Sequence, residues 1–431
     1  MKTKKHIRIN VLIIVSIILT LFTGGVTLSA DDGYELEEVV VLSRHNIRAP
    51  LSTKGSVLDS ATPHTWYEWS SGASELSLRG GMLETAMGQY FRKWLISEGL
   101  FEENYRPTAD EVRFYSNSKQ RTIATAQYFS SGFLPVANSE IDYRVEYDKM
   151  DPVFTPKLTF VSDKYIEDAT RQMKAKLIDL NDEYSLLMDV LDFNDSDAYK
   201  NGEIKPFDED VNEIVLPLDE EPNVKGALRN ATSLADALVL QFYEESDEKA
   251  AAFGHDLEKE DWIAIARIKD VFSDVLYTTD LVSVNIAHPL LEEIDSELNN
   301  DDRLFSFLCG HDSNIASVLG ALKVKDYELP EAIETRTPIG SKLLFEKWKK
   351  GNEEFIRIRL AYDSYDQLRN ISIHDLNNPP MFYTFEFEGL TSNEDGMYKI
   401  DDFLTHLENT INGYDRLLEK YDLRLPKTGI D

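Results

Sequence analysis

The segment from Arg44 to Pro50 places two guanidinium groups beside one imidazole. Arg44 and Arg48 each carry a planar fork of N–H donors, which matches the spacing of phosphate oxygens. The neutral imidazole of His45 has a free lone pair on one ring nitrogen, so it can attack phosphorus without a base to deprotonate it. An exposed basic turn would contain the same residue types. The segment therefore indicates a phosphate site only in combination with others.

Two further segments supply the missing parts of such a site. His311 and Asp312 follow one another: the first could donate a hydrogen bond to phosphate, and the second could protonate a poor alkoxide leaving group. Arg121 lies near the expected start of a helix, where backbone N–H groups also favour anions. Taken singly, His311 could be a hydrogen-bonded histidine at a sheet edge and Arg121 a surface residue. Together with the first segment they predict cleavage of phosphate esters.

Nothing in the sequence has the spacing of a metal or redox site. The eight histidines include no HxH or HExxH pair, and the single Cys309 cannot form an intramolecular disulfide. Acidic patches at 207–210 and 219–221 lack the ordered spacing of a calcium loop and are better interpreted as solvated surface. We expect no catalytic metal and no cofactor.

The elements that hold these residues follow from hydrophobic periodicity. Short apolar runs typical of buried strands cover residues 37–43, 111–115 and 304–310. Helical patterns follow over residues 79–99, from a cap at Asn117 or Ser118 through Phe129, and over 314–322. Alternating strands and helices predict an α/β fold, whose ligands bind beyond the carboxyl ends of the strands. His45, Arg121 and His311 all lie at such ends or just after them.

The middle of the chain differs from the rest. It is rich in Asp and Glu, helix-like between residues 164 and 191, and rich in turns around 201 and 217–222. The prediction is a discontinuous core with an inserted helical cap: residues 34–144 and 260–424 form the core, and residues 145–259 form the cap. Strands over 355–362 and 382–387 and an amphipathic helix over 401–421 complete the core.

These motifs resemble those of the histidine acid phosphatases, which carry an RHGxRxP motif and a distant HD pair. The resemblance extends from about Glu35 to Tyr421 and is strongest to the branch that includes the bacterial glucose-1-phosphatases and phytases. It rests on segments 44–50, 55–58, 120–122, 310–317 and 337–342. Asn46 replaces the glycine of the general motif. The resemblance implies a phosphoglycerate-mutase-like, three-layer α/β core with a smaller helical cap.

The resemblance also implies a role for each matching residue. His45 would be the nucleophile that forms a phosphohistidine, and Asp312 would protonate the leaving oxygen. The phosphate oxygens would be bound by four residues: Arg44, Arg48, Arg121 and His311. Neighbouring arginines lower the pKa of an imidazole, so we expect activity to peak on the acidic side of neutrality.

Substrate choice is left between two phosphate monoesters. Glu244, in the segment 241–244, resembles a residue that limits access in the glucose-1-phosphatases. A carboxylate there would repel a substrate with many phosphates and would accept a sugar phosphate such as glucose 1-phosphate. Glu244 could equally be an ordinary charged helix residue, and phytate is the alternative substrate. A third interpretation is a surface protein that binds sugar phosphates without turnover.

Composition and the two termini bear on location. The 431 residues have a formal net charge of −32 and are 42% hydrophobic, which predicts a folded acidic protein and argues against nucleic acid as a partner. Residues 1–30 have the basic head and apolar run of a signal peptide, with an uncleaved membrane anchor as the alternative. Residues 425–431 contain Leu-Pro-Lys-Thr-Gly, which resembles a sortase signal. We expect a secreted protein, with possible sortase-mediated attachment to the cell wall of a monoderm bacterium. The sequence gives no oligomeric state.

Overall fold

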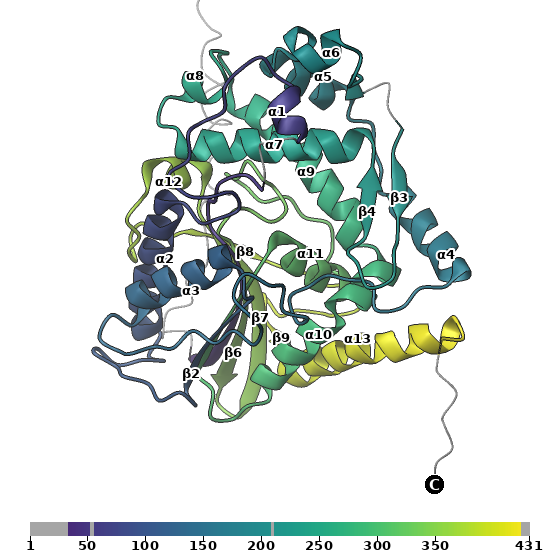
Figure 1. Ribbon diagram of the computed structural model, residues 1–431. Coiled ribbons are helices and arrows are strands. Elements are labelled where there is room, and N and C mark those ends of the chain that lie inside the picture. The colour runs from purple at the N-terminus through teal and green to yellow at the C-terminus, as the bar shows by residue number, and fades with distance from the viewer. Residues whose placement is uncertain (1–32, 52–55, 208–210, 424–431) are drawn as a thin grey trace, which may run out of the picture.

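The computed structural model describes residues 33–51, 56–207 and 211–423, and its centre is a mixed β-sheet (Figure 1). In this part of the chain the sheet has seven strands in the order β2-β5-β1-β6-β7-β8, with β9 paired to β7. The strands of this sheet are β1 (Glu35–Arg44), β2 (Val112–Ser116), β5 (Phe305–Gly310), β6 (Lys342–Lys350), β7 (Glu353–Tyr362), β8 (Met381–Thr384) and β9 (Tyr398–Lys399).

The register of the parallel strands determines where the candidate residues lie. β5 is parallel to both β1 and β2, with Arg44 opposite Gly310 and Ser116 opposite Cys309. The carboxyl ends of all three strands are therefore level. His45, Asn117 and His311 follow these ends, so the three turns lie side by side at one edge of the sheet.

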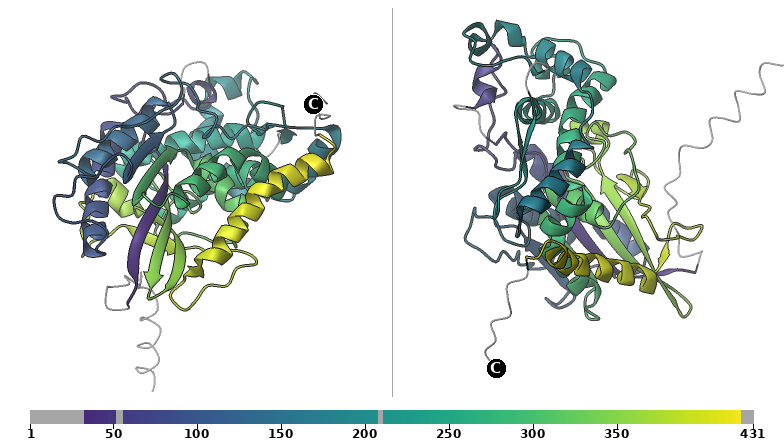
Figure 2. Two further views of the ribbon diagram at one scale, coloured as in Figure 1. Left: turned by 90° about the horizontal axis from the view of Figure 1, so that it is seen from below. Right: turned by 90° about the vertical axis from the view of Figure 1, so that its right-hand side faces the viewer.

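Helices cover both faces of the sheet and make three layers. Along β1, Val39 and Val41 pack into one apolar cluster with α2 and α3, whereas Val40 and Leu42 pack into another with α10, α11 and α13. Figure 2 shows α13 in yellow on the opposite side of the sheet from the blue helices. These helices are α2 (Leu78–Ser97), α3 (Gln120–Phe133), α10 (Asp280–Leu298), α11 (Asp312–Ala321) and α13 (Ile400–Lys420).

A largely helical region lies beyond the carboxyl ends of β1, β2 and β5 (Figure 1). Its core draws on residues outside 145–259 as well, including Leu58, Leu83 and much of α9. The domain boundaries proposed from the sequence stay a prediction. The elements here are α1 (Val57–Ser60), α4 (Asp163–Lys174), α5 (Asn181–Val190), the 3₁₀ turn η2 (Phe193–Asp195), α6 (Asp197–Lys200), β3 (Glu213–Val215), β4 (Asn223–Lys225), α7 (Ala227–Glu244), α8 (Glu248–Ala251), α9 (Lys259–Tyr277) and α12 (Tyr365–Asn370).

The α/β class expected from the sequence is confirmed, and one local expectation, the cap of α3, is wrong. The helix-like pattern between residues 164 and 191 corresponds to two helices, α4 and α5, with residues 175–180 between them. Neither Asn117 nor Ser118 caps α3: its N-cap is Lys119, since Asn117 Oδ1 is bound to other backbone N–H groups.

The strand expected over 382–387 is present as β8, but it ends three residues earlier, at Thr384. The sequence also gave no indication of β6, in which lysines and the buried Glu346 interrupt the apolar pattern. The expected signal peptide (residues 1–30) and the sortase-like tail (residues 425–431) lie outside the described residues. Among the residues described here, no helix is both long and apolar enough to span a membrane.

Candidate active site

The backbone of His45 is held on both sides. The backbone N–H of His45 donates to the carbonyl of Gly310, and the backbone carbonyl of His45 accepts the N–H of Gly340, each at 3.1 Å. Gly340 has a φ of +70°, and a Cβ there would lie 2.4 Å from Asn46 Nδ2, so both the backbone and the close approach require glycine. His45 Nδ1 lies 2.9 Å from the carbonyl oxygen of Asn46. A carbonyl only accepts, so Nδ1 carries the proton and Nε2 keeps its lone pair.

Asn46, which replaces the glycine of the family motif, locks the turn after His45. Its Nδ2 donates to Glu84 Oε1 at 2.8 Å, and its Oδ1 accepts the N–H of Ile47 at 2.8 Å. Glu84 also forms an ion pair of 2.8 Å with Lys342, and both side chains are fully buried. The asparagine thus ties the turn that carries His45 to a buried ion pair.

His311 faces His45 and has the complementary tautomer. Asn117 Oδ1 accepts two backbone N–H groups, so its Nδ2 must be the group that lies 2.6 Å from His311 Nε2. Because Nε2 accepts, the proton of His311 is on Nδ1, which lies 3.4 Å from Nη2 of Arg121. Two donors side by side cannot bind each other; they converge on one acceptor. The two imidazole rings are 5.5 Å apart, nearly perpendicular.

Three arginines surround the two histidines with donors to spare. Arg44 is held by Glu334 at 2.7 Å and Arg48 by Asp236 at 3.0 Å. Within the described residues, the buried Nε atoms of Arg44, Arg48 and Arg121 have no hydrogen-bond partner. Burial and the nearby Arg48 lower the pKa of Arg121 to about 10. A buried, underused set of cationic donors is a site for an anion.

The electrostatics of this pocket favour a neutral nucleophile. Burial lowers the pKa of His45 well below its ordinary value, and the charges of Arg121, Arg48 and Arg44 lower it further. The imidazole therefore remains neutral, with its lone pair on Nε2, into the acidic range.

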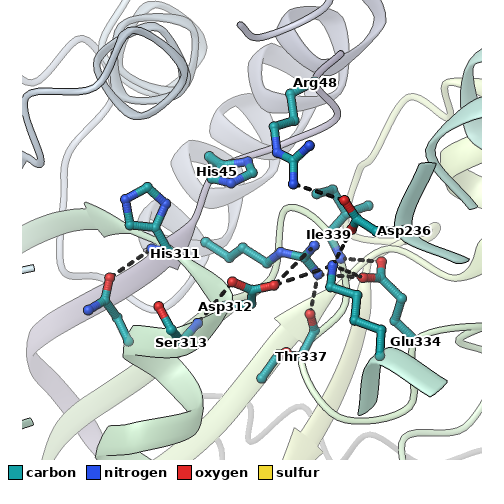
Figure 3. A network of polar contacts seen from close by, with 12 residues as sticks. His45, Arg48, Asp236, His311, Asp312, Ser313, Glu334, Thr337 and Ile339 are labelled. Carbon is teal, nitrogen blue, oxygen red and sulfur yellow. Dashed lines mark hydrogen bonds and ion pairs between the residues drawn. The ribbon is translucent and has the colours of Figure 1, made fainter. Parts of the chain in front are cut away.

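Asp312, the first residue of α11, lies at the opposite side of the pocket among both cations and carboxylates (Figure 3). Its Oδ2 is 3.3 Å from Lys269 Nζ and 3.7 Å from Arg44 Nη2. Lys269 is also 2.7 Å from Asp236 and 3.2 Å from Glu334. The sequence analysis missed Asp236, Lys269 and Glu334, because a charged residue on a helix or in a loop gives no local signal of being buried.

The charge state of Asp312 follows from these neighbours. Burial alone would raise its pKa, but the cations beside it, first Lys269 and then Arg44, bring the pKa well below its ordinary value. In the ligand-free site Asp312 is therefore a carboxylate.

The structure thus brings together six of the seven residues selected from the sequence: Arg44, His45, Arg48, Arg121, His311 and Asp312. Glu244 is different. It ends α7 and accepts a hydrogen bond of 2.9 Å from Ser77, the N-cap of α2. In the described parts of the chain no hydrogen bond or ion pair joins Glu244 to the other six, and its role in selectivity stays a prediction. The same parts contain no group of three or more His, Cys, Asp or Glu residues placed to bind a metal ion.

Comparisons with known proteins agree with this geometry. The sequence profile of the histidine phosphatase superfamily (branch 2) matches residues 35–363. The chain is 35% identical over 402 residues to a glucose-1-phosphatase of Salmonella typhimurium, which covers 90% of this chain and 97% of the relative. It is 36% identical over 377 residues to that of Providencia rettgeri, which covers 85% and 90%.

Among solved structures, the phytase of Citrobacter braakii superposes with a TM-score of 0.78 at 26% identity, covering 89% of this chain and 98% of that one. The profile match spans well over half of the chain and includes all six clustered residues. The chain therefore belongs to the histidine phosphatase superfamily (branch 2) and is a phosphomonoesterase of the histidine acid phosphatase family.

Proposed function

We propose that this phosphomonoesterase hydrolyses a sugar phosphate such as glucose 1-phosphate through a phosphohistidine on His45. The observation that carries the proposal is the orientation of His45. Its Nδ1 is engaged by a carbonyl, which leaves the Nε2 lone pair free beside the spare N–H donors of three arginines. The two relatives at 35% and 36% identity, both glucose-1-phosphatases, support the choice of substrate.

The first step transfers the phosphoryl group. His45 Nε2 forms a bond to phosphorus, the bond between phosphorus and the ester oxygen breaks, and its electron pair stays on the departing oxygen. Arg44, Arg48 and Arg121 stabilise the charge on the non-bridging oxygens. Asp312 gives the departing oxygen a proton, so the sugar leaves as a neutral alcohol.

Asp312 is a carboxylate before substrate binds, so it must gain this proton when the phosphate ester enters the site. A phosphate monoester brings negative charge next to Asp312, and a nearby like charge raises a carboxyl pKa. The proton comes from water or from the monoanionic form of the ester, which is abundant below about pH 6. Because Asp312 must be protonated while His45 stays neutral, the activity should have its optimum at acidic pH.

The second step restores the enzyme. Asp312, again a carboxylate, accepts a proton from a water molecule whose oxygen bonds to phosphorus. The bond between phosphorus and Nε2 breaks, and its electron pair returns to the imidazole. Inorganic phosphate leaves, and His45 is neutral as before.

The test is release of inorganic phosphate from glucose 1-phosphate and from phytate, side by side, between pH 4 and 7. We expect faster release from glucose 1-phosphate and none from the His45→Ala variant. His406→Ala is the matched control, since His406 lies on α13 and its imidazole binds the carbonyl of Leu322. Preference for phytate would favour the alternative supported by the Citrobacter phytase. No release from either substrate would leave a binding protein without turnover.

Location is a separate proposal that rests on the sequence alone. Residues 1–30 would direct export, and residues 425–429 would serve as a sortase signal in a cell-wall protein. Export predicts a secreted chain that lacks the first residues. Immunodetection in medium, wall and cytoplasmic fractions checks this; an uncut chain confined to the cytoplasm would contradict it.

A further inference from the structure

A single ammonium group lies at the centre of the carboxylates around the active site. Lys269 Nζ is 2.7 Å from Asp236, 3.2 Å from Glu334 and 3.3 Å from Asp312. Burial and the charge of Arg44 oppose its protonation, but the three carboxylates outweigh them and raise the pKa of Lys269. Lys269 is therefore an ammonium ion throughout the acidic and neutral range.

Each of these carboxylates also contacts an arginine that flanks His45. Asp236 is 3.0 Å from Arg48, Glu334 is 2.7 Å from Arg44, and Asp312 is 3.7 Å from Arg44. The carboxylates are thus shared between Lys269 and an arginine of the phosphate pocket. Asp236 uses one oxygen for each cation, whereas Glu334 and Asp312 each contact both cations through a single oxygen, Oε1 and Oδ2.

The sharing balances charge. Lys269, Arg44 and Arg48 provide three positive charges for three carboxylates. Without the ammonium group, two arginines would have to neutralise all three. Their N–H groups would be drawn toward the carboxylates and away from phosphate, or one carboxylate would take up a proton. Asp312 is the member of the set with the most open side chain, 30% exposed, and so the one for which proton uptake is easiest.

We propose that Lys269 is a positioning residue of the phosphatase reaction: it shares the three carboxylates with Arg44 and Arg48, which keeps arginine donors free for phosphate and Asp312 ionised until substrate binds. Lys269 touches neither phosphorus nor the nucleophile. The inference rests on the proposed phosphatase mechanism and adds to it the origin of the charge state of Asp312.

Several other charged or titratable groups influence Asp312 from the elements packed around it. Lys269 is the strongest of the cations that lower its pKa. The other cations are Arg44 at the end of β1 and Arg121 on α3, and the titratable imidazoles of His45 and His311 and the phenol of Tyr277 on α9 also lie near it. The nearby carboxylates are Glu221 between β3 and β4, Asp236 on α7 and Glu334. These carboxylates favour protonation of Asp312, and the cations oppose it. Without Lys269, Asp312 should therefore keep its proton up to a higher pH.

The test compares Lys269→Met with the wild type on glucose 1-phosphate, with kcat and KM measured separately from pH 4 to 8. We expect the alkaline limb of the kcat profile to move up by about one pH unit, as for loss of a charge within a few ångströms. We expect KM to rise, because the arginines become more engaged by carboxylates. Lys269→Arg keeps the charge and should keep both the limb and KM near wild type.

Two further variants make the test specific. Lys259→Met is the matched control: Lys259 lies at the start of the same helix, where it pairs with the exposed Glu331. Its profile should not change. The double variant Lys269→Met with Asp236→Asn restores charge balance, so KM should return toward wild type while the alkaline limb stays displaced. If Lys269→Met folds poorly, the double variant still tests whether the alkaline limb is displaced.

The outcomes separate this inference from the proposed function. The role of Lys269 would be overturned if the wild type is active and the folded single or double variant has the same alkaline limb and the same KM as the wild type. If the wild type releases no phosphate from any ester, the proposed function fails instead. Binding of inorganic phosphate, measured by titration calorimetry, then still tests Lys269: weaker binding to Lys269→Met supports the sharing of carboxylates, and equal binding contradicts it.

Discussion

Two buried charge networks in this protein use the same residue types with opposite results. One lies in the sheet and joins Glu346 of β6 to Arg357 and Arg359 of β7. The other is the active-site network of Arg44 and Arg48 with their carboxylates. In both networks, the two arginines are buried. They differ in what the arginines have left to donate.

The sheet network is closed. Glu346 accepts bonds from the Nε of both arginines, at 3.0 Å and 2.7 Å, and from the indole of Trp348 at 3.1 Å. The guanidinium of Arg357 covers the Trp348 ring, and that of Arg359 covers Phe382, with 5.1 Å and 4.3 Å to the ring centres. The pKa of Glu346 is lowered, because its two arginines outweigh the effect of burial. Among the described residues, no fully buried side-chain nitrogen of Arg357 or Arg359 lacks a hydrogen-bond partner.

The active-site network is open. The Nε atoms of Arg44, Arg48 and Arg121 are buried yet without a partner among the described residues, and the carboxylate of Asp312 is partly exposed. Unsatisfied buried donors cost free energy in the empty protein, and an anion would satisfy them. Buried arginine N–H groups without a partner therefore distinguish the binding site from the structural network, whereas buried charge alone does not.

The largest expected effect comes from the open network. His45→Ala should reduce kcat on glucose 1-phosphate by on the order of 10⁴-fold or more, since no neighbouring group can replace the nucleophile. The variant should still unfold cooperatively, because within the described residues the imidazole makes a single hydrogen bond, to a local carbonyl. Steady-state kinetics and thermal unfolding measure the two properties. A folded variant with wild-type turnover would remove His45 from the mechanism.

The closed network should respond in the opposite way. Glu346→Gln leaves two buried guanidinium groups without their counter-ion and should lower the free energy of unfolding by about 3–5 kcal/mol. The kcat of the folded fraction should not change. Urea unfolding checks the first expectation and kinetics at low temperature the second. Glu354→Gln, on the exposed part of β7, is the control and should have little effect. Equal stability of the two variants would mean that the sheet network is not structural.

A smaller effect tests how the open network sets the charge of its nucleophile. After burial, Arg121 is the strongest cause of the lowered pKa of His45. Attack needs the neutral imidazole, so activity is lost as pH falls through this pKa. Arg121→Met raises the pKa, and the acidic limb of the profile of log kcat/KM should move to higher pH by about one unit. Arg121→Lys keeps the charge, so its acidic limb should lie close to that of the wild type. An acidic limb that stays in place would assign the lowered pKa to burial alone.

The sequence predicts the cationic half of the site well, because each of its residues follows a strand end in a short motif. Residues such as His45 and His311 are far apart in the chain, but the parallel register of β1 and β5 makes their strand ends level. The α/β class follows from the same local patterns.

The anionic half could not be predicted in this way. Asp236 and Lys269 lie on helices and Glu334 in a loop, and only the packing of α7 and α9 against the site brings them together. β6 was missed for a related reason. A buried glutamate in a strand contradicts the apolar pattern unless its partners are known, and Arg357 and Arg359 come from the next strand. Long-range charge pairing has no signature within a short window of sequence.

The most direct test of the account is to trap the phosphorylated enzyme during turnover of glucose 1-phosphate. The reaction is stopped at alkaline pH, where a phosphorus–nitrogen bond survives, and the peptides are analysed by mass spectrometry. The account predicts one added phosphoryl group on the peptide that contains His45, absent from His45→Ala and from enzyme without substrate. Steady turnover with no phosphoryl group on His45, or with the group on another residue, would contradict it.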